Sequence, residues 1–393
     1  MNANAATAAS AGSLPDYLAP VFAQYPLEVV SGEGVYLNTR DGRRVLDLYG
    51  GHAVAALGYG HPGFTAALAR QARELNFQSN AVPLAVRTRA AQRLIRFAGL
   101  DFNSVFFVNS GAEANENALK MAFTANAGRT EVVALEQAFH GRTAAAGALT
   151  WGSAGKWYGF PRAPFDVTFI PRREVAALAR ITERTAAVIV EPVQGVGGAF
   201  EMGASYLAAL RRRCQETGAV LIFDEVQIGM GRCGEPFAAK LYGVQPDMLT
   251  TAKALGNGFP CAALLMSPRI AKAVKLDALG TTFGGGPMAC AVIEAVIEAL
   301  ESEQLLANVR RQTAYIRERC RVGPVQGFQG EGFLHGLIMD RPAKLVHAEL
   351  LRRDILTGTS GDPAVIRLLP PYTLQESHVE QLRAALLDIG SQP

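Results

Sequence analysis

The sequence predicts an α/β protein whose mostly parallel sheet is covered by helices on both faces, and two observations lead to that prediction. Short apolar runs typical of buried strands recur through the middle of the chain, at 105–108, 132–135, 167–170, 187–190, 220–223 and 262–266. Between several of them lie amphipathic stretches with apolar residues at three- and four-residue spacing, at 112–125, 172–184 and 204–216. This alternation is typical of β-α-β units and of a parallel sheet.

The outer parts of the chain predict a second, smaller α+β domain built from both termini. Residues 32–47 predict two strands around the Asp41-Gly42 turn. After the sheet, 289–300, 305–320 and 379–387 have a helical pattern and 333–339 a strand pattern. The expected division is a flexible tail (1–13), the N-terminal part of the small domain (14–58), a large domain (59–282) and the C-terminal part of the small domain (283–393).

Composition bounds the class of protein. With 393 residues, 49% hydrophobic and 19% charged, the chain can form a large globular core. Its net charge of +3 comes without a basic cluster, which argues against nucleic acid or an anionic membrane as partner. No apolar run approaches the roughly 18 residues that span a bilayer. The five cysteines are odd in number and widely spaced, and the first thirteen residues have neither a secretory nor a transit-peptide pattern, so we expect a cytoplasmic protein with reduced thiols.

Asp224 and Lys253 are the most informative pair of residues. Asp224 ends the apolar run 219–223, so a buried strand would deliver its carboxylate to the ligand-binding edge of the sheet. Such an acid could pair with a cationic pyridinium ring, and a nearby lysine could hold the same ring as a Schiff base. Alternatively, Asp224 caps a helix and Lys253 is simply solvated.

Two further motifs follow predicted strands. Ser110-Gly111-Ala112 opens a helix after the strand at 105–108, which suits a phosphate, although N-capping by Ser110 or Asn109 needs no ligand. Phe139-His140-Gly141-Arg142 follows the strand at 132–135. Its aromatic ring could stack on a flat cofactor and its arginine could clamp a carboxylate, with core packing and a surface ion pair as the alternatives.

Arg367 lies inside an apolar run, between Val365-Ile366 and Leu368-Leu369. A lone arginine in such a run must face an acid or an anionic ligand.

Other chemistries find less support. The pattern G-x-G-x-x-G occurs at 58–63 and 229–234, but neither copy fully meets the conditions for a dinucleotide fingerprint, so a dinucleotide-dependent oxidoreductase is the alternative from another enzyme class. The six histidines lack metal-ligand spacing, and no G-x-S-x-G or H-E-x-x-H motif occurs. We therefore expect no metal site.

Taken in order, these motifs, together with Asp224-Glu225-Val226-Gln227 and Thr281-Thr282-Phe283-Gly284-Gly285, resemble the class III (ω-amino) pyridoxal-phosphate aminotransferases, most closely the acetylornithine group. The resemblance runs from about Gly32 to Pro371. It implies fold type I with 59–282 as the domain that binds pyridoxal 5'-phosphate, and a homodimer with shared active sites. It also implies transfer of the terminal amine of N-acetylornithine to 2-oxoglutarate, giving N-acetylglutamate 5-semialdehyde and glutamate in arginine biosynthesis. Ornithine, N-succinylornithine and 4-aminobutyrate are alternative donors.

The resemblance also implies which residues bind the cofactor and which bind the substrates. Lys253 would be the Schiff-base lysine and proton carrier, and Asp224 would keep the pyridine nitrogen protonated. The other cofactor-binding residues would be Ser110, Gly111, Ala112, Phe139, His140, Val226, Gln227 and, from the other subunit, Thr282. Arg142 would bind the distal carboxylate of the donor and Arg367 the α-carboxylate of glutamate or 2-oxoglutarate.

Two positions depart from the family pattern. Val196 stands where the family usually has a glutamate that masks the α-carboxylate arginine. His52 stands where ornithine aminotransferases carry a substrate-contacting tyrosine, and so is a candidate substrate-binding residue.

Overall fold

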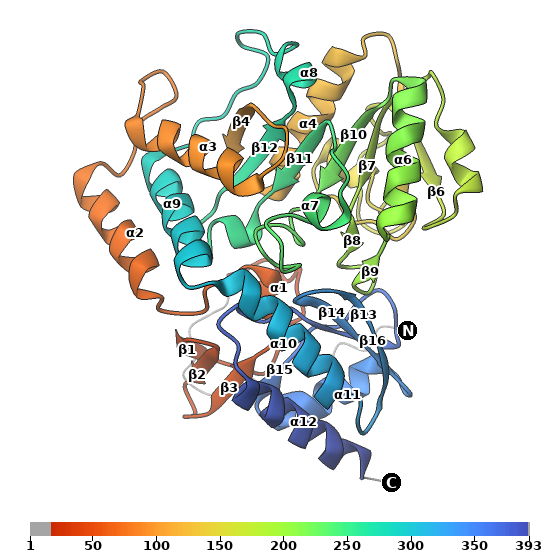
Figure 1. Ribbon diagram of the computed structural model, residues 1–393. Coiled ribbons are helices and arrows are strands. Elements are labelled where there is room, and N and C mark those ends of the chain that lie inside the picture. Colours follow the sequence, from red (N-terminus) through yellow and green to blue (C-terminus); the bar gives the residue numbers. More distant parts are fainter. Residues whose placement is uncertain (1–16, 392–393) are drawn as a thin grey trace.

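A computed structural model describes residues 17–391. Its main feature is a seven-stranded sheet in the upper part of Figure 1. In spatial order the strands are β4 (Ser104–Val108), β12 (Ala262–Met266), β11 (Met248–Thr251), β10 (Val220–Asp224), β7 (Thr185–Val190), β5 (Glu131–Leu135) and β6 (Asp166–Ile170). Only β12 runs antiparallel to its neighbours, so the predicted mostly parallel sheet is confirmed.

Alternate residues of the strands enter two different cores, which is why the strands are apolar throughout. In β10, Val220 and Ile222 belong to the core that lies under helix α4 (Gly111–Ala125), whereas Leu221 and Phe223 belong to the larger core on the other face. Helix α6 (Ala204–Thr217) packs on that second face through Leu207 and Leu210. Both sheet faces are therefore buried, as a parallel sheet requires.

Further helices surround this sheet. They are α2 (Pro62–Glu74), α3 (Ala85–Ala98), α5 (Ala144–Ala148), α7 (Ala238–Tyr242), α8 (Pro268–Ala271) and α9 (Pro287–Ser302), with the 3-10 turns η1 (Ala176–Arg180) and η2 (Lys253–Leu255). The two-stranded ribbon β8 (Val193–Gln194) and β9 (Phe200–Glu201) projects from the sheet.

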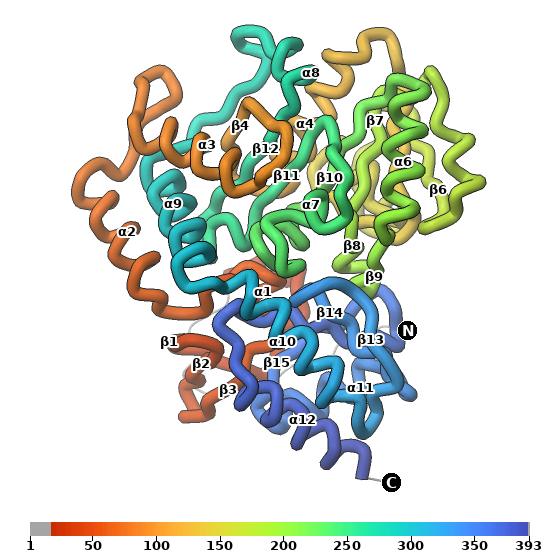
Figure 2. Tube along the Cα trace, viewed as in Figure 1, coloured from red at the N-terminus to blue at the C-terminus, as the bar shows by residue number. Residues whose placement is uncertain are grey.

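The N-terminal and C-terminal segments of the described chain lie side by side in the lower part of the molecule (Figures 1 and 2). β3 (Arg44–Asp47) pairs in parallel with β15 (Ile355–Leu356), which joins the ends directly. The other elements of this part are α1 (Gly50–Ala53), β1 (Val29–Glu33), β2 (Tyr36–Thr39), α10 (Leu305–Arg319), β13 (Val325–Glu331), β14 (Leu334–Met339), α11 (Ala343–Arg352), β16 (Val365–Leu368) and α12 (Glu376–Gly390).

The structure differs from the predicted elements at three places. The stretch 172–184 forms only the 3-10 turn η1, because Arg173 adopts a left-handed conformation (φ 58°) and one turn suffices to bury Leu178. The N-terminal region has β1 in addition to the two predicted strands around Asp41-Gly42. The strand β11 was not predicted. The expected tail at 1–13 lies outside the described residues.

Within residues 17–391 no helix is long and apolar enough to cross a membrane. All five cysteines are buried and form no disulfide.

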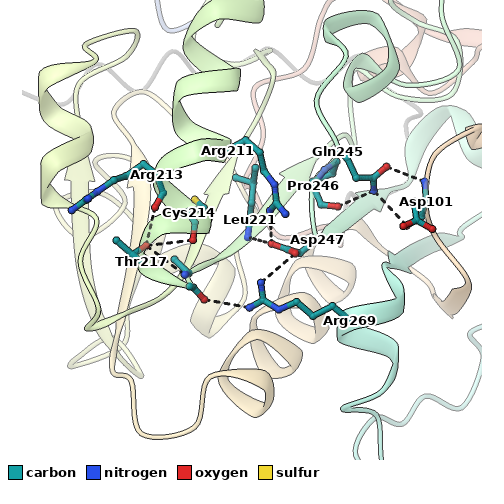
Figure 3. Close-up of polar contacts among 12 residues, drawn as sticks. Asp101, Arg211, Arg213, Cys214, Thr217, Leu221, Gln245, Pro246, Asp247 and Arg269 are labelled. Carbon is teal, nitrogen blue, oxygen red and sulfur yellow. Dashed lines mark hydrogen bonds and ion pairs between the residues drawn. The ribbon is translucent and has the colours of Figure 1, made fainter.

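Asp247 joins the amino-terminal ends of the central strands, opposite the edge that carries the candidate site (Figure 3). Its buried carboxylate accepts a hydrogen bond from the Leu221 backbone N–H at 2.9 Å. It also forms ion pairs with Arg211 at 2.7 Å and Arg269 at 3.5 Å. One side chain thus connects β10, α6 and the segment after β12.

We expect Asp247→Ala to lower the free energy of unfolding by about 2–3 kcal/mol, because a buried N–H loses its acceptor and two arginines lose their partner. Chemical denaturation would measure it. Asp101→Ala is the matched control, since Asp101 meets Gln245 only through its backbone N–H and C=O. Equal stability of the two variants would contradict this role of Asp247.

Candidate active site

The predicted site residues gather where the parallel strands end. Asp224 is the last residue of β10, and Lys253 lies two residues after the end of β11. Ser110 follows β4 at the start of α4, and Phe139 and His140 follow β5. Because the carboxyl ends of parallel strands share one edge, residues distant in sequence meet there.

The Asp224 carboxylate is buried and held by three donors. Its Oδ2 lies 2.8 Å from His140 Nδ1 and accepts a hydrogen bond from Asn115 Nδ2, also at 2.8 Å. Its Oδ1 accepts from the Val226 backbone N–H at 3.1 Å. Asn115 is oriented in turn by the Thr250 hydroxyl, which donates to Asn115 Oδ1 at 2.7 Å. These hydrogen bonds therefore fix the position of the Asp224 carboxylate.

Lys253 is held in a left-handed conformation (φ 46°) at the first position of η2. Burial lowers the pKa of its ammonium group, and the nearby Asp224 and Glu191 carboxylates oppose that change. A lowered pKa increases the share of neutral amine, which is the form that acts as nucleophile or base.

Glu191 is a buried acid at the same edge, one residue beyond β7. Its carboxylate accepts hydrogen bonds from the backbone N–H groups of Phe139 at 2.8 Å and Gly195 at 3.2 Å. Burial raises the pKa of Glu191 to about 7, with His140 lowering it and Asp224 raising it further. Glu191 thus fixes the segment that carries Phe139.

The first turn of α4 lies directly against the segment after Asp224. A Cβ atom on Gly111 would lie 2.6 Å from Val226 Cγ1, so only glycine fits here. The Ser110 hydroxyl accepts from the Glu113 backbone N–H at 3.2 Å and so caps the helix, as the ligand-free alternative predicts. First-turn N–H groups have no partners inside a helix, and together with the dipole they favour an anion.

Arg142 is exposed and lies between two aromatic rings. Its guanidinium carbon is 5.3 Å from the ring centre of Phe139 and equally far from that of Trp157. Within the described part of the chain it has no ion-pair partner, so the surface ion pair considered above is not formed.

Arg367 lies on β16 and is buried. Its Nε donates to the Thr359 carbonyl at 2.8 Å, while Nη1 is buried without a hydrogen-bond partner. No carboxylate among residues 17–391 forms an ion pair with it, and Val196 is 40% exposed. Burial lowers the pKa of Arg367, and a buried cation of this kind calls for an anionic ligand.

His52 lies within the electrostatic influence of Arg367, Lys253 and Arg142. The pKa of its imidazole is lowered by burial and then by the positive charges of Arg367, Lys253 and Arg142. Its backbone carbonyl accepts from Gln227 Nε2 at 3.3 Å. Thr282 is exposed, and the described contacts do not connect its side chain with the other residues of the site.

Sequence reasoning missed three residues of this arrangement: Asn115, Glu191 and Tyr49. Glu191 follows a buried strand in the same way as Asp224, so the same pattern could have found it. Asn115 is the fifth residue of α4 and its burial follows only from the fold. No pattern in the sequence marks Tyr49, which lies against Arg367 and His52.

The structure also bears on the two alternative chemistries, a metal site and a dinucleotide site. No group of three or more histidine, cysteine or acidic side chains suited to a metal occurs among residues 17–391. The glycine pattern at 58–63 runs into α2 without a strand directly before it, and the one at 229–234 precedes α7, a helix of five residues. Neither arrangement supports the dinucleotide-dependent alternative.

Comparison with known proteins identifies the family. The model of the class-III aminotransferases matches residues 17–389. An acetylornithine aminotransferase of Streptomyces coelicolor is 41% identical over 372 residues, 93% of this chain and 91% of its own.

Solved structures agree. The ornithine aminotransferase from Toxoplasma gondii ME49 superposes with a TM-score of 0.89 at 27% identity, covering 95% of this chain and 92% of its own. An amine transaminase from an uncultivated Pseudomonas species, in its pyridoxal-phosphate-bound form, superposes with a TM-score of 0.86 at 26% identity, covering 96% and 98%. The fold is therefore that of the type I pyridoxal-phosphate-dependent transferases, and the chain belongs to the class-III aminotransferase family and is a transaminase.

Proposed function

We propose that the chain transfers the terminal amine of N-acetylornithine to 2-oxoglutarate, with pyridoxal 5'-phosphate bound at the carboxyl edge of the seven-stranded sheet. The observation that carries this proposal is Arg367, a buried guanidinium whose Nη1 has no hydrogen-bond partner. The positive charge of Arg367 also lowers the pKa of the Lys253 amine. It offers a carboxylate site next to a reactive amine.

The residues at this edge fit the cofactor. The start of α4 presents first-turn N–H groups for a phosphate, with Gly111, Ala112 and Ser110 there. Asp224, fixed by His140 and Asn115, presents a carboxylate for a pyridinium nitrogen. Phe139 and Val226 would pack on the two ring faces, Gln227 would reach the ring hydroxyl, and Thr282 would come from a second subunit.

When bound, the cofactor supplies a carbonyl carbon that captures amines covalently and a protonated ring that withdraws electrons. Asp224 would hold the proton on the ring nitrogen through a charge-assisted hydrogen bond. Lys253 would hold the cofactor through its Nζ, and the amine, once free, would accept the proton from the substrate carbon that bears the reacting nitrogen. Burial lowers the pKa of Lys253 and so increases the share of neutral amine.

The two arginines would orient the two substrates differently. Arg142 would bind the carboxylate at the far end of N-acetylornithine, which leaves the terminal amine at Lys253. Arg367 would bind the α-carboxylate of glutamate or 2-oxoglutarate. Ornithine would place a free α-ammonium near the positive charge of Arg142, which disfavours it, whereas an acyl group makes that nitrogen neutral.

This proposal includes arginine biosynthesis as the pathway, which the name of the acetylornithine aminotransferase relative supports. It also includes a homodimer with shared sites, in which Thr282 would come from the second subunit. A cytoplasmic location also belongs to it, supported by five buried cysteines without a disulfide. The division into domains at 14–58, 59–282 and 283–393 is proposed likewise, in accordance with the grouping of the sheets.

A donor panel tests the substrate. With 2-oxoglutarate as acceptor, we expect N-acetylornithine to give a kcat/KM at least ~5-fold above that of ornithine, because like-charge contacts cost ~1 kcal/mol or more in a partly dry site. N-Succinylornithine and 4-aminobutyrate complete the panel, with glutamate formation as the assay. A preference for ornithine or 4-aminobutyrate would contradict the proposed donor.

Arg142→Gln separates the two substrates in the same assay. Loss of a charge-assisted contact should raise the KM for N-acetylornithine roughly 10-fold or more and leave the KM for 2-oxoglutarate nearly unchanged. Arg162→Gln, an exposed arginine on the loop before β6, is the matched control.

A further inference from the structure

The guanidinium of Arg367 has few hydrogen-bond partners, all of them neutral. Its backbone is paired on both sides, with Gly336 of β14 and with Gly358, so the residue cannot shift easily. Its side chain has one close acceptor, the Thr359 carbonyl at 2.8 Å, and one distant acceptor, the Tyr49 hydroxyl, 3.5 Å from Nη2. Tyr49 is thus the only side chain of the described residues that contacts the charged end of Arg367 through a polar atom.

The Tyr49 hydroxyl stands between Arg367 and His52. It lies 2.6 Å from His52 Nδ1, and the two rings are 4.7 Å apart. Burial raises the pKa of Tyr49, so the phenol is neutral. Burial and three nearby cations lower the pKa of His52, so its imidazole is neutral too and Nδ1 can accept the phenol proton. The phenol oxygen then turns its lone pairs toward Arg367.

The backbone around Tyr49 and His52 has a conformation that accommodates their two rings. A Cβ atom on Gly358 would lie 2.2 Å from the Tyr49 ring, so the glycine provides space for the ring. Gly50, Gly51, His52 and Ala53 all have positive φ values, between 54° and 69°. For the two residues that carry a Cβ this conformation costs about 1–3 kcal/mol each. Strain of this kind is typical of positions where a side chain must point in a set direction.

We propose that Tyr49 is a specificity-determining residue whose hydroxyl, held ready by His52, gives a second donor to the carboxylate bound by Arg367. In the free enzyme the O–H donates to His52 Nδ1. When the carboxylate reaches Nη1 and Nη2, the O–H turns to it. Because the phenol is neutral, the carboxylate need not displace a charged partner from Arg367. This inference rests on the proposed function, since it takes Arg367 as the carboxylate site.

Tyr49→Phe tests the proposal. Removal of one donor to a carboxylate should raise the KM for 2-oxoglutarate and for glutamate about 10-fold, while kcat and the KM for N-acetylornithine change less than about 2-fold. Calorimetric titration of the holoenzyme with glutarate, which has the carboxylates but no reactive ketone, should show the same weakening. Tyr36→Phe is the matched control, because the Tyr36 hydroxyl donates to Gln381 at 3.3 Å, outside the site.

The outcomes are separable. An unchanged glutarate affinity and an unchanged KM for 2-oxoglutarate in an active Tyr49→Phe enzyme would overturn the role of Tyr49 and leave the proposed function standing. Equal loss for every substrate together with a lower Tm would also overturn it, because that result describes a packing role. If the wild-type enzyme transfers no amine to 2-oxoglutarate from any donor, the proposed function itself fails.

Discussion

Replacing Lys253 with alanine is expected to abolish transamination, with a loss of at least ~10³-fold in kcat. The residue would both capture the cofactor covalently and move the substrate proton, and either role alone is typically worth ~10²–10⁴-fold. The fold should persist, because η2 is a single turn and its amide hydrogen bonds do not involve this side chain. Steady-state kinetics and circular dichroism would measure the two effects.

The same variant tests the attachment point. Wild-type enzyme should purify yellow and, after borohydride reduction and proteolysis, carry the label on the peptide with Lys253. Lys272→Ala, which removes an exposed lysine, should keep both colour and rate. Substantial activity in Lys253→Ala, or a label on another lysine, would rule out this assignment.

Asp224→Asn should retain the cofactor but lower the rate of the chemical step by ~10²–10³-fold. A neutral amide cannot hold a proton on the ring nitrogen, and removal of a preorganised charge from a buried site has effects of this size. Single-turnover measurements with N-acetylornithine would report the chemical step, and absorbance would report cofactor content. The defect should therefore lie in the rate and not in binding.

Glu225 provides a matched control for Asp224. It is the next residue, is equally buried, and accepts hydrogen bonds from Ala238 and Ala239 at the start of α7. Burial raises its pKa to about 8, so it is largely protonated at neutral pH and Glu225→Gln removes little charge. A single-turnover rate in Asp224→Asn equal to that of Glu225→Gln would show that the charge of Asp224 has no catalytic role.

The strands of the large sheet could be predicted from the sequence, because burial on both faces requires a continuous apolar run. The predicted runs at 105–108 and 220–223 are the cores of β4 and β10, because a strand between two helical layers must be apolar throughout. The antiparallel β12 was predicted as a strand but not in its direction. The helix predicted at 172–184 was wrong because apolar spacing cannot reveal the left-handed Arg173.

Strand ends explain which site residues could be predicted. Asp224 and the motifs at 110–112 and 139–142 each follow an apolar run, so their common edge could be inferred before any contact was known. Tyr49 and Asn115 could not be placed in that way. Tyr49 reaches Arg367 across 318 positions, and Asn115 reaches Asp224 across 109.

The sequence by itself determined the fold class and the edge of the sheet where Asp224 and Lys253 lie, because the burial pattern of each strand is a local property of the chain. Only the tertiary structure decided which side chains surround the charges of Asp224 and Arg367. His140 and Asn115 hold Asp224, and Tyr49 with His52 covers Arg367. Hydrogen bonds of this kind depend on distances of about 3 Å between distant segments, and no spacing along the chain encodes them.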